Sequence, residues 1–169
     1  DVRPLIDKAN VGIKEDRKFV LKLLNNIKKS KKRSEIEMKK LSTLVAYYEV
    51  KAGQSVKKQL VDLTEKVNIF PDSLILAQAS LESAWGTSRF AAEGNNFFGQ
   101  HCFSKGCGIS ARGDKKVEVA KFVSVYDSIQ SYYRNLNSGK AYKKLRRLRS
   151  EELSKLKKMN SLKLTEGLS

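Results

Sequence analysis

The sequence predicts a mainly α-helical fold that carries one small β region. Apolar residues recur at spacings of three and four along most of the chain, which is typical of amphipathic helices. Ser or Pro precedes several of these segments, and such residues favour helix starts. Alternating apolar and polar residues, typical of strands, occur only between residues 97 and 125. The β region is therefore expected to be small.

Three helices are predicted before residue 68. The first covers residues 15–29, and the basic cluster 28–33 is expected to form an exposed turn after it. The second helix starts at Ser34, and Glu37, three residues further on, completes a capping box. Ser55 then caps the third helix.

The fourth helix lies in the longest stretch of low charge, residues 71–99. Pro71 suits the first turn of a helix, and Gly86 suits the position just after its end. The small residues between them permit close packing, so this helix is predicted to be central and buried. It carries Glu82 in apolar company, next to Trp85.

The β region is predicted to contain two strands, residues 97–103 and 117–125, joined by a loop over 107–116. Helices follow, the first ending near Gly139 and a last one beginning at Ser150. No internal repeat and no change of composition divides the chain, whose 169 residues suit one domain.

Cys102 and Cys107 lie in the β region, separated by four residues that include a Gly. This spacing permits a disulfide, which indicates an oxidising compartment. A metal site that includes His101 is the alternative, but no second cluster of His or Cys completes a tetrahedron. We therefore expect a disulfide, and neither a metal nor a cofactor.

The chain has 34 Lys and Arg and 18 Asp and Glu, a net charge of +16. Such a charge indicates an anionic partner, namely nucleic acid, an anionic membrane surface or an acidic polymer such as cell wall. Solubility alone is the other explanation. No apolar run reaches the roughly 18 residues of a membrane span, so no stable membrane insertion is expected. The first ten residues contain no apolar signal core, so any export signal was removed or never included.

Glu82 is a candidate general acid. Apolar surroundings and a place in the last turn of its helix are both expected to raise the pKa of its carboxyl group. A carboxylic acid that keeps its proton near neutral pH is able to protonate a leaving oxygen. The alternative is an ordinary solvated acid at a helix end.

The segment LESAWGTSRFAAEGNNFFG resembles the signature of the β-N-acetylglucosaminidases of glycoside hydrolase family seventy-three. The segments FFGQHCFSKGCGI, VAKFVSVYDSIQSYYRNLN and AYKKLRRLR resemble its Bax-like branch. The resemblance covers residues 55–149. Residues 1–54 are then expected to be an N-terminal helical extension, and residues 150–169 to be C-terminal helices of the same domain.

The resemblance implies a lysozyme-like α+β fold, mainly α, with a small β-hairpin lobe over the catalytic cleft. It implies a peptidoglycan hydrolase that cleaves the β-1,4 bond after N-acetylglucosamine, with Glu82 as general acid. The family usually draws a second carboxylate from the β lobe. We choose Glu118 over Asp114 and Glu93, because Glu118 lies in the strand that leads to Tyr126. Retaining, inverting and substrate-assisted mechanisms all remain open.

The resemblance also places six residues against the substrate. Aromatic faces suit sugar rings, and amides suit sugar hydroxyls. The expected binding residues are Trp85, Asn96, Phe98, Gln100, Tyr126 and Tyr132. Each also has a structural interpretation: Trp85 in particular suits a core, and Asn96 suits a turn.

The chain departs from the family pattern in two places. Ala84 stands where the motif often has Gly. Bax-like chains usually continue into a further helical segment beyond the equivalent of Ser169.

The expected location is the periplasm or the cell exterior, in association with the wall.

Two other functions compete with glycoside hydrolysis. A lytic transglycosylase acts on the same polymer with a single acid/base, and suits the chain if no second carboxylate approaches Glu82. A nucleic-acid binder driven by the Lys and Arg clusters would leave Glu82 and the cysteine pair unexplained. We therefore expect peptidoglycan, and no nucleic acid, as the partner.

Overall fold

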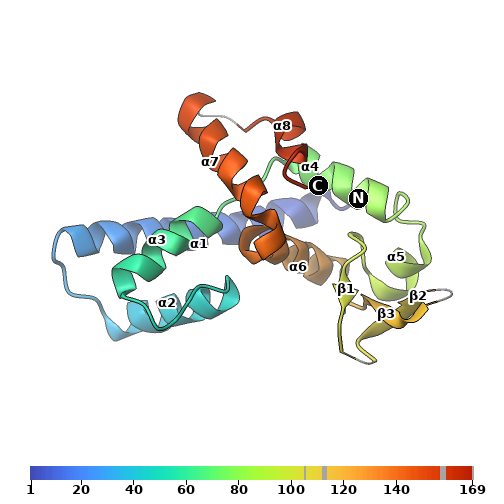
Figure 1. Ribbon diagram of the computed structural model, residues 1–169, viewed down its shortest axis with the longest axis horizontal. Helices are drawn as coiled ribbons and strands as arrows, with labels where there is room; N and C mark the ends of the chain where they lie inside the picture. The colour runs from blue at the N-terminus through green and yellow to red at the C-terminus, as the bar shows by residue number, and fades with distance from the viewer. Residues whose placement is uncertain (105, 112–113, 157–158, 169) are drawn as a thin grey trace. The chain divides into compact units, whose positions relative to one another are not determined.

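A computed structural model describes residues 1–104, 106–111, 114–156 and 159–168 as helices joined by loops and one small sheet (Figure 1). The mainly α fold with a small β lobe is confirmed. The helices are α1 (Arg3–Lys28), α2 (Glu35–Tyr47), α3 (Val56–Lys66), α4 (Asp72–Glu82), α5 (Arg89–Gly94), α6 (Val125–Ser138), α7 (Lys143–Leu156) and α8 (Ser161–Thr165), with a 3-10 turn η1 (Lys140–Tyr142). The strands are β1 (His101–Cys102), β2 (Gly108–Ala111) and β3 (Asp114–Ala120).

The contacts of the chain divide it into two compact units. Unit 1 consists of Asp1–Ala9 and Pro71–Tyr133, and unit 2 consists of Asn10–Phe70 and Arg134–Ser169. The helices α1 and α6 each contribute residues to both units. The predicted boundaries near residues 54 and 149 do not coincide with this division. Residues that are distant in sequence therefore build each unit.

The sheet of unit 1 is antiparallel, with β3 between β1 and β2. It includes a strand, β2, in the stretch that the sequence predicts to be a loop. The reason is Gly108, a residue that weakens a strand prediction but is required by this pairing. A Cβ atom there would lie 2.0 Å from the carbonyl oxygen of Val119. The first predicted strand is correspondingly shorter than expected and forms only β1.

The helix α4 ends earlier than the sequence predicts. It stops at Glu82, and Ala84, Trp85 and Gly86 follow with φ angles of 49°, 58° and 82°. These three left-handed residues form a tight turn, in which the Gly86 N–H donates to the Ser83 hydroxyl at 2.7 Å. Local side-chain bonding of this kind competes with helix continuation.

The prediction that this helix is central and buried is wrong. Its buried residues are Leu74, Ile75 and Ala79, whereas Leu81 is 74% exposed. The core interpretation of Trp85 is wrong too, because the left-handed turn leaves its side chain 84% exposed. One face of α4 packs in unit 1 and its C-terminal end is open to solvent.

The helices of unit 2 surround an aliphatic core that includes Leu23, Leu41, Leu60, Leu63 and Leu145, each at most 1% exposed. The predicted capping box is confirmed: Ser34 accepts from the Glu37 N–H, and the Glu37 side chain accepts from the Ser34 N–H. Ser55 caps α3 as predicted. The helix expected to begin at Ser150 is instead the second half of α7, which runs through that residue without a break.

In unit 2, cationic side chains donate hydrogen bonds to the carbonyl groups at the carboxyl ends of α2, α3 and α6. The last carbonyls of a helix have no partners inside it and carry partial negative charge. Lys66 donates to the carbonyls of Tyr48 and Glu49 after α2. Arg146 does the same at Leu136 and Gly139, at the end of α6.

Two arginines converge on the end of α3. Arg17 donates to the carbonyls of Thr64 and Val67. Arg149, 1% exposed, stacks on the Phe70 ring at 4.3 Å. Its guanidinium donates to four oxygens, namely the carbonyls of Glu65, Lys66 and Asn68 and the side chain of Asn137. Burial lowers the pKa of Arg149 to about 9. This arginine ties α7 to α3.

Candidate active site

Glu82 lies at the last position of α4, in unit 1, with its side chain exposed to solvent. The expected apolar surroundings of this carboxyl group are not found, because the chain turns sharply after residue 82 and does not cover it. Among the described residues, none makes a hydrogen bond or ion pair with it. The carboxylate is therefore accessible to a ligand.

A glycine holds the chain close beside this carboxylate. Gly99 has a φ angle of 59°, and a Cβ atom on it would lie 3.1 Å from Oε2 of Glu82. Glycine adopts this conformation without strain and leaves the space that the acid occupies. The segment after Asn96 thus forms one wall beside Glu82.

The turn after α4 presents an aromatic side chain next to the acid in sequence. Trp85 is held in a left-handed conformation that non-glycine residues rarely adopt. Strained backbone of this kind gathers at functional sites. Gly86 also packs closely, since a Cβ atom there would lie 3.4 Å from the Phe97 ring.

Asn96 builds the loop that carries Gly99. It is 1% exposed, and its amide nitrogen donates to the carbonyls of Gln100 and Ala120 at 2.8 and 2.9 Å. Its side-chain oxygen accepts from the backbone N–H groups of Phe98 and Gln100. Both donors and both acceptor sites of the amide are thereby used. The structure gives Asn96 the turn-stabilising role.

Phe98, Tyr132 and Gln100 fix this loop to α6. The rings of Phe98 and Tyr132 stack with centroids 4.1 Å apart, and both residues are buried. The Gln100 side chain donates to the carbonyl of Ser128 and accepts from the hydroxyl of Ser131. These three predicted binding residues are engaged in packing within unit 1. Tyr126 differs: it is half-buried, and the Lys8 ammonium lies 4.4 Å from its ring centre.

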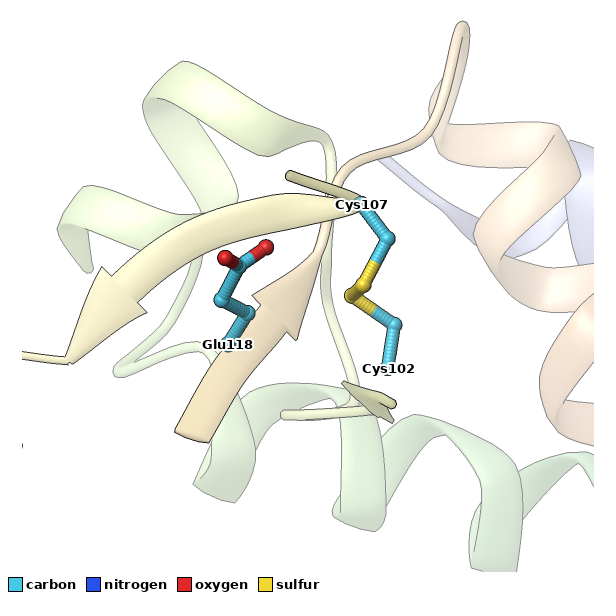
Figure 2. Close-up of side chains that lie close together, drawn as sticks. All are labelled: Cys102, Cys107 and Glu118. Carbon is cyan, nitrogen blue, oxygen red and sulfur yellow. A yellow bond between two sulfur atoms is a disulfide. The ribbon is translucent and has the colours of Figure 1, made fainter. Parts of the chain in front are cut away.

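Glu118 lies on β3 beside the disulfide (Figure 2). Its two carboxyl oxygens accept from the backbone N–H groups of Gly106 and Gly108, at 3.0 and 2.9 Å. These donors flank Cys107, so Glu118 holds the segment that the disulfide closes. Of the rival candidates, Glu93 is exposed on α5, and the side chain of Asp114 lies outside the described residues.

The predicted disulfide is confirmed between Cys102 and Cys107. Their sulfur atoms and a Glu118 oxygen lie within 4.8 Å of one another, which is also the spacing of metal ligands. Sulfur binds metals as a thiolate, however, and both thiols are consumed in the disulfide. The grouping is accounted for by the cross-link and by the clamp that Glu118 makes.

Comparison with known proteins identifies the family. Residues 57–164 match the family model for Glucosaminidase, described as mannosyl-glycoprotein endo-beta-N-acetylglucosaminidase. The chain belongs to the Glucosaminidase family. It is also 32% identical over 151 residues to "Protein bax" of Escherichia coli (strain K12), covering 89% of this chain and 53% of that protein. The chain thus spans about half the length of the curated relative. No solved structure matches.

The family match includes most of the segment from Ser55 to Arg149 that carries the sequence resemblance. None of the described helices is long and apolar enough to cross a membrane.

Two features of unit 1 were not predicted from the sequence. Gly99 was part of the motif, but only its closeness to Glu82 gives it a role. Phe103 was predicted to be the last residue of a strand, but it lies in the segment that the disulfide closes and is 99% exposed. The Cys spacing was the available signal, since a closed loop tends to expose the side chains at its tip.

Proposed function

We propose that this protein hydrolyses the β-1,4 bond after N-acetylglucosamine in bacterial cell-wall glycan strands, with Glu82 as the general acid. The observation that supports this role is the placement of Glu82: an accessible carboxyl group at a helix end, with the Gly99 backbone directly beside it. The family match supports the class of substrate.

In the proposed reaction Glu82 gives its proton to the bridging glycosidic oxygen as the bond from that oxygen to the sugar carbon breaks. The bonding electrons stay with the oxygen, which leaves as a hydroxyl group. The sugar carbon acquires oxocarbenium character and is then attacked by water, which loses a proton to the solvent, while the Glu82 carboxylate regains a proton from the solvent. Glu82 must therefore reach the oxygen from an open position, as its exposure allows.

For substrate binding we propose Trp85, whose side chain is 84% exposed, and Tyr126, which is half-buried with the Lys8 ammonium over its ring. An exposed aromatic face offers a flat apolar surface to a pyranose ring. Asn96, Phe98, Gln100 and Tyr132 are then positioning residues, because their polar groups and rings already hold the Gly99 loop on α6. They act through the placement of Gly99.

Glu118 supports a second candidate function. Both of its carboxyl oxygens accept backbone N–H bonds, so Glu118 has a structural role that does not depend on catalysis. A lytic transglycosylase needs only one acid/base, and closes the muramic acid on its own hydroxyl to give an anhydro end. The two reactions therefore differ in their products.

The test is digestion of purified peptidoglycan, with mass analysis of the new ends. Reducing N-acetylglucosamine ends support the glucosaminidase, and anhydro-muramic ends support the transglycosylase. Glu82→Gln is expected to lower the rate by at least about a hundredfold in either case. Glu93→Gln, an exposed acid of the same unit, is the matched control and should retain activity.

Binding is measured separately in the Glu82→Gln variant. Trp85 is the one tryptophan of the chain, so its fluorescence reports directly on this turn. A soluble cell-wall glycan fragment should shift the emission. If the variant digests the wall as fast as the parent, Glu82 is not the acid.

We also propose a periplasmic or extracellular location, consistent with the disulfide.

A further inference from the structure

The net positive charge of the chain lies in one of its two units. Of the 34 Lys and Arg, 26 lie in unit 2 and eight in unit 1. The 18 Asp and Glu divide into ten and eight. Unit 1, which carries Glu82, is therefore neutral, and unit 2 carries the whole net charge of +16. Attraction of a substrate to Glu82 does not explain this distribution.

Structural roles account for only part of the excess of basic over acidic side chains in unit 2. In unit 2 the side chains of Arg17, Lys66, Arg134, Arg146 and Arg149 donate to backbone carbonyls. Without these five, unit 2 still has 21 basic against ten acidic side chains. Net charge of this size raises the local concentration of anions and speeds their association.

Two hollows in unit 2 gather part of this remaining charge. The first, of about 500 Å³, lies between the end of α1 and the start of α2 and is lined by Ile27, Ser30, Lys31, Lys32, Arg33 and Met38. The second, of about 690 Å³, lies along α7 and is lined by Glu65, Lys143, Lys144, Arg147 and Ser150. Each hollow thus combines three cations with a serine hydroxyl, and the second also includes the Glu65 carboxylate.

We propose that unit 2 is a binding unit for an anionic cell-wall polymer, and that the two hollows receive carboxylate or phosphate groups of its chain. The proposal rests on the proposed function, which makes a wall glycan the substrate of unit 1. Binding through a second surface raises the effective concentration of substrate without changing the chemistry. The neutral unit then performs the reaction and the basic unit provides attachment.

The residues in the hollows favour this occupant over other anions. Neither lining includes an aromatic residue, whereas single-stranded nucleic acids are usually held by aromatic stacking platforms. A hollow receives a protruding group or a strand, while an anionic lipid surface is met by a raised basic and apolar face. Cations combined with a serine hydroxyl offer hydrogen bonds to carboxylate or phosphate oxygens.

The test uses the full chain with Glu82→Gln, which separates binding from digestion. One variant replaces Lys31, Lys32 and Arg33 with Gln, and a second replaces Lys143, Lys144 and Arg147 with Gln. The matched control replaces Lys14, Lys18 and Lys51, which are exposed in unit 2 outside both hollows, and removes the same charge. Co-sedimentation with purified cell-wall sacculi gives the affinity at several salt concentrations.

Each hollow variant should bind sacculi about tenfold more weakly than the parent and with a flatter salt dependence, while the control changes less than about threefold. Equal losses in all three variants would overturn the assignment to the hollows. Tighter binding to phosphatidylglycerol vesicles or to single-stranded DNA than to sacculi would overturn the occupant. Separately, turnover of soluble glycan by the Glu82 parent reports on the proposed function, so that failure there is distinguished from failure of attachment.

Discussion

At the scale of single residues, Glu82 and Gly99 form a close pair, because a Cβ atom on Gly99 would lie 3.1 Å from Oε2 of Glu82. The acid ends a helix and is left open by a left-handed turn, and the glycine occupies a backbone conformation that brings the next loop against it. A side chain on residue 99 would be strained by the left-handed backbone and would collide with the Glu82 carboxylate. The pair therefore gives a sharp test of how closely the acid must be placed.

Gly99→Ala is expected to lower kcat on peptidoglycan by at least about tenfold, because the added methyl group would displace the Glu82 carboxyl group. The left-handed backbone adds about 1 kcal/mol of strain to the folded state. Gly53→Ala is the control, since nothing lies within 4 Å of a Cβ atom there. Unchanged kcat in a Gly99→Ala protein that is folded by circular dichroism would contradict the closeness of the pair.

The sequence predicted Glu82 through its motif, but it did not distinguish binding residues from positioning residues. An asparagine in a motif looks the same whether its amide meets a sugar or its own loop. Only the four hydrogen bonds of Asn96 show that its capacity is used within unit 1. Trp85 shows the opposite outcome: its surrounding sequence suggested a buried helix residue, but a left-handed turn exposes its side chain.

At the scale of elements, the small sheet depends on one side chain from its central strand. Glu118 joins β3 to both sides of Cys107, so the strand, the disulfide and the closed segment are held together. Phe103 is presented by the same segment. This arrangement gives Glu118 a structural role in the β lobe.

Glu118→Gln should reduce the free energy of unfolding by about 1–3 kcal/mol, since the amide replaces one acceptor with a donor that faces a backbone N–H. Urea unfolding measures this change. The rate on peptidoglycan should fall by less than about tenfold, in contrast to Glu82→Gln. A rate loss as large as that of Glu82→Gln, with stability unchanged, would restore Glu118 as the second catalytic group.

The buried arginine of α7 allows an equally direct comparison. Arg149→Met should destabilise the protein by about 3 kcal/mol or more, because the carbonyls after α3 lose a donor that is inaccessible to water. Arg147→Met, two positions away but exposed, should cost less than about 1 kcal/mol. Chemical denaturation of both variants is the measurement. Equal effects would show that burial of the guanidinium does not decide its contribution.

The capped starts of α2 and α3 were predicted correctly, whereas the start of α1, at Arg3 and not at residue 15, and the end of α4 were predicted wrongly. The reason is physical. A capping box such as Ser34 and Glu37 is a local interaction within four residues, so its pattern is visible in the sequence. The end of α4 instead depends on a turn in which Ser83 binds Gly86, and β2 depends on a neighbour ten residues away. Non-local pairing of this kind leaves little trace in hydrophobic periodicity.

At the scale of the whole molecule, total charge was readable from composition, but its location was not. The stretches that make up unit 1 are separated by more than sixty residues, so the neutral unit appears only when the chain is folded. Net positive charge within unit 2 also works against its own folding, because like charges repel most strongly in the compact state. Stability should therefore respond to salt.

Raising NaCl from about 20 mM to about 300 mM should increase the free energy of unfolding by about 1 kcal/mol, because the Debye length falls below the spacing of most surface cations. Urea unfolding at each salt concentration measures the change. The variant with Gln at Lys14, Lys18 and Lys51 has less repulsion to screen, so its gain should be smaller. A loss of stability with added salt would show that favourable ion pairs such as Lys163 with Glu152 outweigh repulsion within unit 2. An equal gain in that variant would show that its three lysines do not contribute to the repulsion.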